Sequence, residues 1–283
     1  MVVIHIKKGD GDAFLYETTC QTNNGDLIKE LCEIWNLRLR LAQLVGGVRD
    51  VGLYGPMKPT DQFGLDTIKE EAGEIIDKGE YYRPDPTGHR TGNGPGPQLM
   101  ETIEKVSLDA ESVIKDTLVK RKIATTKEML QEKLDNIRGA VTMAYPMGLP
   151  EWDTVRLTIE GDEGLDGTAA GEAVLDGERA ELWVASRNFD RSQSVGDRLG
   201  KNEKTKVIGK LQKPGAGAPG REAAVSEDEK KAMMAFYFKK QEEMKKLAEN
   251  DDDDYLGAAW ADPKALQNSL RGGSGGVRAP GIR

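Results

Sequence analysis

The stretch that decides the fold is the opening MVVIHIKKGDGDAFLYE, residues 1–17. Apolar residues recur at positions 2, 4 and 6, which is the period of a β-strand with one buried face. Gly9 to Asp12 are residues typical of a tight turn, and Ala13 to Glu17 are predicted to form the returning strand. The stretch predicts a β-hairpin at the start of the chain.

A helix is predicted directly behind the hairpin. From Asp26 to Val45 apolar residues recur every three or four positions, with a break expected near Asn36. The order strand, turn, strand, helix resembles the start of a ubiquitin-like β-grasp, although Leu53 to Pro56 would make a poor third strand. We therefore predict an N-terminal α+β domain over residues 1–80, with a ubiquitin-like fold as one alternative.

Proline and glycine divide the rest of the chain. Residues 81–97 hold four prolines and four glycines and are predicted to be a linker. A mainly helical middle domain is expected over residues 98–213, followed by a second linker at 214–225. Residues 226–283 are expected to form a C-terminal helix and a flexible tail. The fold class predicted for the whole chain is α+β, dominated by helix.

Within the middle domain, an apolar stripe from Leu99 to Thr117 predicts a long amphipathic helix. Thr125 and Glu128 have the spacing of a capping box that starts a second helix. Arg156 to Glu160 alternates like a strand, and Ala169 to Arg187 is predicted to be a helix anchored by Trp183. In the C-terminal segment, Ser226 and Glu229 predict another capping box.

Charge and composition exclude several classes of function. A formal net charge of −8 argues against general nucleic-acid binding, because a phosphate backbone must be met by a basic face. No apolar stretch is long enough for a membrane helix, and the start lacks the features of a secretory signal. Two cysteines, Cys20 and Cys32, cannot build a disulfide framework. We expect a protein of the cytoplasm.

Motifs for catalysis are weak. The run Gly215 to Gly220 matches the glycine pattern of dinucleotide-binding loops, but lysine-rich sequence precedes it and no helix follows at once, so a linker is the favoured interpretation. The two histidines, His5 and His89, lie in a predicted strand and a predicted linker. We expect no enzymatic activity, no catalytic residues, no cofactor and no metal site. The role of the acidic run Asp251 to Asp254 is left open, with a solvated surface as the favoured interpretation.

The remaining candidates are contacts with a protein partner. A lysine series could dock an acidic partner tail or could be a solvated loop; its candidate contact residues are Lys201, Lys204, Lys206 and Lys210. Tyr255 and Trp260 lie in the C-terminal tail, where aromatic residues mark docking or fold back on the chain's own helices.

Four stretches carry a resemblance to a known family: RGAVTMAYPMGLP at 138–150, GKNEKTKVIGKLQKPGAGAPGRE at 200–222, KKQEEMKKLAENDDDDYL at 239–256, and WAD at 260–262. In this order they resemble the cilia- and flagella-associated protein 298 (Kurly) family. The resemblance spans about residues 98–270, with a weaker echo in the first ten residues.

The resemblance implies a non-catalytic factor needed for cytoplasmic preassembly of axonemal dynein arms, and so for the motility of cilia. It also implies links to the basal body and to planar cell polarity. The partners expected are axonemal dynein chains and other assembly factors or chaperones. The alternatives are a structural component of the axoneme and a polarity-signalling adaptor.

Overall fold

The computed structural model describes residues 1–8, 11–65, 78–220, 227–249, 264 and 267. The chain divides into two compact units, Met1–Glu222 and Ala223–Arg283. The division falls within the stretch 214–225 that was predicted to be a linker, whereas the stretch 81–97 lies inside the first unit.

The predicted hairpin is present at the start of the first unit. Strands β1 (Val2–Lys8) and β2 (Gly11–Thr18) are antiparallel, with Ile4 opposite Tyr16. Val2, Ile4 and Ile6 have no exposed surface, as their alternation predicted.

Helix α1 (Asn24–Tyr54) follows and is unbroken. The side chain of Asn23 accepts a hydrogen bond from the backbone of Gly25 and so caps its N-terminus. The break predicted near Asn36 was wrong, because the side-chain amide of Asn36 bonds to another segment of the chain and does not interrupt the helix. It donates to the carbonyl oxygen of Leu175 and accepts from the Leu175 N–H.

The sheet has the strand order β2-β1-β5-β3-β4. Strand β5 (Lys206–Gln212) lies parallel to β1 and antiparallel to β3 (Glu181–Val184), and β4 (Arg187–Asn188) pairs with β3. Residues 1–80 therefore supply two of the five strands. The fold class is α+β with helix dominant, as predicted, and the hairpin, helix and central parallel pair leave the ubiquitin-like alternative open.

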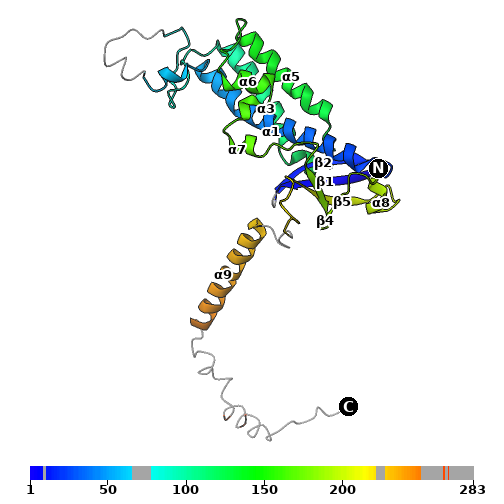
Figure 1. Cartoon of the computed structure of the whole chain (residues 1–283). Coiled ribbons are helices and arrows are strands. Elements are labelled where there is room, and N and C mark those ends of the chain that lie inside the picture. Colours follow the sequence, from blue (N-terminus) through cyan, green and yellow to red (C-terminus); the bar gives the residue numbers. More distant parts are fainter. Residues whose placement is uncertain (9–10, 66–77, 221–226, 250–263, 265–266, 268–283) are drawn as a thin grey trace, which may run out of the picture. The chain divides into compact units, whose positions relative to one another are not determined.

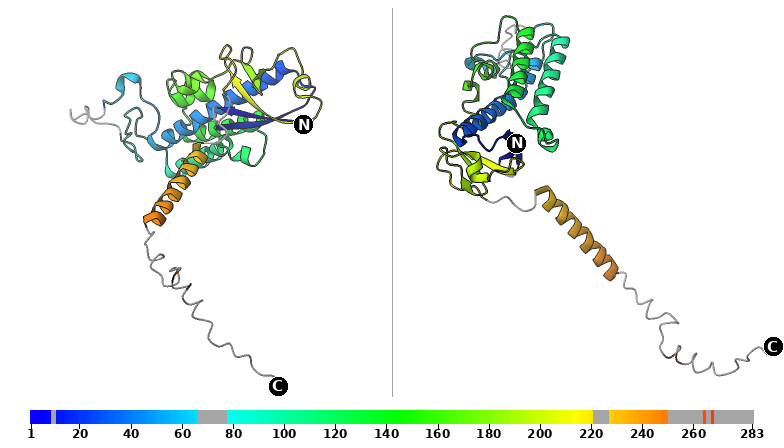
Figure 2. Two further views of the ribbon diagram at one scale, coloured as in Figure 1. Left: turned by 90° about the horizontal axis from the view of Figure 1, so that it is seen from below. Right: turned by 90° about the vertical axis from the view of Figure 1, so that its right-hand side faces the viewer.

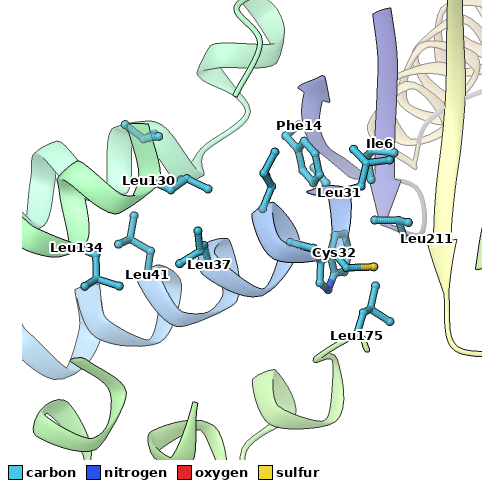
Figure 3. Close-up of a cluster of buried hydrophobic side chains, with 14 of the residues drawn as sticks. Ile6, Phe14, Leu31, Cys32, Leu37, Leu41, Leu130, Leu134, Leu175 and Leu211 are labelled. Atoms are coloured by element: carbon cyan, nitrogen blue, oxygen red, sulfur yellow. The ribbon is translucent and has the colours of Figure 1, made fainter. Parts of the chain in front are cut away.

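Helix α1 connects the sheet to a group of helices (Figures 1 and 2). Its first half packs on the sheet, where Leu31 lies beside Phe14 and Ile6, and Cys32 lies on the side of Leu211 and Leu175 (Figure 3). Its second half packs on α3 (Pro97–Ile114) and α5 (Lys127–Ala144). Figure 3 shows Leu37 and Leu41 facing Leu130 and Leu134 of α5. Burial of a side chain of this size contributes about 1.5–3 kcal/mol, so one helix ties both parts into one core.

Short elements complete the first unit. They are η1 (Thr60–Gln62), α4 (Thr117–Lys120), α6 (Thr154–Glu160), η2 (Glu163–Leu165), α7 (Ala169–Glu172) and α8 (Val195–Leu199). Among the described residues, no helix is both long and apolar enough to cross a membrane.

Three predictions for the middle region were wrong. Residues 156–160 belong to helix α6 because Asp153 caps it, its carboxylate accepting from the Val155 N–H. The α5 cap is Thr126, not Thr125, whose own N–H donates to Leu15 at the edge of β2. The helix predicted over 169–187 ends at Glu172, and Trp183 lies on strand β3 between the buried Leu182 and Val184.

The stretch 81–97 is held against the rest of the first unit by a buried ion pair. Arg90 is 7% exposed and its Nη1 lies 3.3 Å from Oδ2 of Asp153, which has no exposed surface. The same guanidinium donates to the carbonyl oxygen of Gly55. Isolated bridges also pair Met57 with Arg90 and Tyr82 with Asn93. Proline and glycine here shape an ordered connection.

The second unit contains helix α9 (Glu227–Glu249). Six large apolar side chains on it are between 51% and 74% exposed: Met233, Met234, Phe236, Tyr237, Phe238 and Met244. The capping box predicted with Ser226 rests on a residue outside those described, as do the acidic run at 251–254, Tyr255 and Trp260.

Candidate protein-docking groove

The sheet has one face packed on α1 and one face turned away from it. On β1 the residues that alternate with the buried set are Val3 and His5. The strand register places His5 beside Leu15 of β2 and beside Ile208 of β5, and places Val3 beside Lys206. Because paired residues point to the same side of a sheet, these side chains form one outer surface.

A groove of about 420 Å³ lies over this outer surface. Residues 119–124, from the end of α4 into the loop before α5, supply one wall. We define the groove by its lining residues: Val3, His5, Leu15, Glu17, Val119, Lys122, Ala124, Lys206, Val207 and Ile208. Ile208 remains 47% exposed although it lies on the central strand of the sheet.

Main-chain hydrogen bonds hold the wall in place. The N–H of Lys122 donates to Val119 and the N–H of Ile123 donates to Leu118, which is the double hydrogen bond of a Schellman helix end. The N–H of Thr125 then donates to Leu15, 2.8 Å away, joining the wall to the edge of β2. Main-chain hydrogen bonds therefore fix the wall to the sheet.

Lys122 holds an unusual conformation at this helix end. Its φ is +61°, in the left-handed region that favours glycine. A lysine at this position costs about 1 kcal/mol relative to glycine. Strain of this kind is a reason to look for a function of the side chain, and here the side chain lines the groove.

Two basic segments meet at the groove. One contains Lys120, Arg121 and Lys122 and lies within the wall segment 119–124. The other contains Lys201, Lys204 and Lys206 and leads into β5. Lys122 and Lys206 line the groove itself, where Glu17 is the acidic residue of the lining. The local charge is thus opposite in sign to the net charge of −8 of the chain.

The predicted contact residues fall in different places. Lys206 lines the groove, and Lys210 lies on the same strand and beside Trp183 of β3. Lys201 and Lys204 are exposed just before the strand, where the Lys204 N–H donates to the side chain of Asn202. Tyr255 and Trp260 lie outside the described residues.

Sequence reasoning missed Lys122 and the apolar floor. The alternation in KVIGKLQ, residues 206–212, was a signal for a strand with an outer face. The proximity of residues 119–124 to that strand had no signal in the sequence, because it depends on the parallel pairing of β5 with β1.

Chemistry at the groove favours binding. Among the described residues, no group of three or more His, Cys, Asp or Glu side chains could hold a metal ion. The thiol of Cys20, just after β2, is buried and donates to the carbonyl oxygen of Gly200, and burial followed by the Glu203 carboxylate raises its pKa. The lining offers apolar surface and positive charge, which together suit recognition of a polypeptide.

Comparison with known proteins gives the class. The chain is 40% identical over 281 residues to a protein of Danio rerio and equally to one of Homo sapiens, in each case covering 96% of this chain and 97% of the relative. A Drosophila melanogaster relative is 33% identical with the same coverage. All three are cilia- and flagella-associated proteins by description, and this chain is a protein of that class.

The particular family follows from the same comparisons. The chain belongs to the cilia- and flagella-associated protein 298 family, whose model matches residues 180–275. The matched region includes β3, β5 and α9, and therefore the β5 side of the groove with Lys206. The family is named for its association with cilia and flagella and not for a reaction. No solved structure matches the chain.

Proposed function

We propose that the chain is a non-catalytic factor that acts in the cytoplasm to preassemble axonemal dynein arms, and so is required for the motility of cilia. Its membership of a cilia- and flagella-associated family supports the ciliary setting. The observation that carries a role in protein contact is the basic and apolar groove on the outer face of the sheet. The exposed apolar side chains of α9 offer a second surface of the same kind.

The partners in this proposal are axonemal dynein chains and other assembly factors or chaperones. A preassembly factor must hold a client and release it, which favours limited docking surfaces over a large obligate interface. A groove of about 420 Å³ and a single helix face are surfaces of that limited size.

The test is fractionation of the tagged protein from cells that are building motile cilia. Detergent-soluble cytoplasm is compared with salt-washed axonemes, and the proteins that co-purify are identified by mass spectrometry. We expect most of the protein in the cytoplasm, bound to dynein heavy chains, and a loss of dynein arms from axonemes when it is depleted. Retention in salt-washed axonemes at a fixed ratio to tubulin would instead identify a structural component. Enrichment at basal bodies with polarity proteins, and without dynein, would favour the adaptor alternative.

A further inference from the structure

The floor of the groove is mainly apolar and open. Ile208, Val3 and Leu15 lie on the outer face of the sheet with His5 between Leu15 and Ile208, and Val119 and Ala124 close one side. A side chain 47% exposed on a central strand leaves apolar surface in contact with water. Apolar surface ringed by charged groups is the pattern of an interaction site.

The size of the groove limits what can enter it. A volume of about 420 Å³ is near the lower end of ligand pockets, which run from about 300 to 1,000 Å³. It can take one or two large side chains of a polypeptide segment, whereas the surface of a folded domain would meet the wall at residues 119–124 first. The occupant is therefore a segment with a protruding anchor.

The charges limit the composition of that segment. Lys122 lies on the wall and Lys206 at the start of β5, so cations approach the floor from two elements. Lys201 and Lys204 extend the positive charge beyond the groove. An acidic segment complements this arrangement, while a basic one is repelled by it.

We propose that the groove binds an acidic segment of a partner protein through one Leu, Phe or Trp side chain that packs on Ile208, with carboxylates on either side pairing with Lys122 and Lys206. This inference rests on the proposed function only in taking the occupant to be protein. It adds what the partner must present, namely an apolar anchor between acidic residues.

The experiment measures binding of labelled synthetic peptides to the full-length protein by fluorescence anisotropy. The probe peptide carries a central Leu between Asp and Glu residues. Comparison peptides replace the Leu with Ser, or every acidic residue with Lys. Heparin serves as a polyanion that has no apolar anchor. Dissociation constants are measured at low and at physiological salt.

Three variants separate the contribution of charge from that of the apolar contact. Lys122→Glu with Lys206→Glu reverses the groove charge and should weaken binding at least about tenfold. Ile208→Ala removes the floor contact and should weaken binding about fivefold, with little change in salt dependence. Lys239→Glu with Lys240→Glu makes the same change in net charge on α9 and should leave binding unchanged, which separates a local effect from a general one. Melting temperatures confirm that each variant is folded.

Loss of binding in both groove variants, and weak binding of the Ser peptide, would establish the proposal. Equal effects of the groove and α9 charge reversals would overturn it, and so would heparin binding that competes with the peptide but is insensitive to Ile208→Ala. The result is independent of the fractionation experiment. Co-purification of dynein with no peptide binding would reject only the groove assignment, and peptide binding without dynein would reject only the assembly role.

Discussion

Lys122 is the residue at which stability and binding are expected to conflict. It takes a left-handed conformation at a helix end where glycine is favoured, while its side chain lines the groove. Lys122→Gly should therefore raise the free energy of unfolding by about 1 kcal/mol and at the same time weaken binding of the acidic probe. Urea unfolding and peptide anisotropy measure the two effects.

Lys122→Ala is the matched control. Alanine removes the charge but keeps the Cβ that makes the left-handed conformation costly, so binding should fall without any gain in stability. An equal gain in stability from alanine and glycine would show that the backbone strain is not the cause.

For single residues, sequence patterns identified side chains that face the core but missed residues that tertiary structure brings together. Ile4 and Ile6 could be assigned to the buried face because alternation alone determines which side of a strand they occupy. Lys206 could be singled out by its place in a lysine series, but Lys122 could not. The two are separated by 84 positions, and neither local pattern refers to the other.

Among elements, the connection 81–97 depends on the buried pair of Arg90 and Asp153. The Asp153 carboxylate also accepts from the N–H of Met57 and of Val155, so it caps α6 while it binds the connection. Arg90→Ala should destabilise the fold by about 3 kcal/mol, because it leaves a buried carboxylate without its cation. Chemical denaturation gives the free energy of unfolding.

The double variant Arg90→Ala with Asp153→Asn tests the reason for that loss. Removal of the second charge should recover part of the stability, since Asn can keep the α6 cap. If the double variant is as unstable as the sum of both single variants, the loss comes from packing and not from the unpaired charge.

The carboxylate of Glu111 on α3 pairs with Arg49 on α1, and the stability that this pair contributes should depend on pH. Hydrogen bonds from Lys115 and then Arg49 hold the pKa of Glu111 below its ordinary value of 4.5. A lowered folded pKa means that its contribution to stability is fully present above pH 4.5 and is lost as the pH falls through the folded pKa. Glu111→Gln should lower the melting temperature at pH 6, and the difference from the parent protein should shrink by pH 3.

Glu101→Gln is the comparison for this effect. Glu101 also has a lowered pKa, owing to its hydrogen bond with Lys105, but both residues lie on α3 and the pair joins no other element. Its effect at pH 6 should be smaller. Equal effects at both positions would mean that the link to α1 contributes nothing.

Elements with strong local signals could be predicted, and those with competing signals could not. The hairpin and α1 followed their periodicities. Residues 156–160 alternate as a strand would, yet the Asp153 cap starts a helix there. Trp183 was assigned to a helix because nothing local indicated that β5 lies beside it. A local cap outweighed the alternation at 156–160, whereas sequence separation hid the pairing that places Trp183 on a strand.

For the whole molecule, the first unit should fold only when residues 181–212 are present. Strand β5 covers one edge of β1, and the buried side chain of Leu211 is opposite Leu182 of β3. A fragment of residues 1–222 should show one cooperative thermal transition, while a fragment of residues 1–180 should not. Circular dichroism and calorimetry compare them. A cooperative transition in the shorter fragment would show that α1 and its helices form an independent core.

The fold class was predictable at this scale, but the way in which the chain closes on itself was not. Hairpin, helix content and the acidic composition all follow from local sequence. The parallel pairing that creates the groove joins residues about 200 positions apart, and such pairings depend on the packing of everything between them.

The pairing of β1 with β5 also means that β1 remains without its partner strand during much of synthesis. Strand β1 leaves the ribosome before β5, which follows about 200 residues later. At about 5–20 residues per second, this interval lasts roughly 10–40 s. Throughout that time the nascent chain carries an uncovered strand edge and a long helix whose apolar face is not yet covered, a combination that favours aggregation. We therefore expect the segment from β1 to α1 to need shielding by a chaperone until β5 has been made.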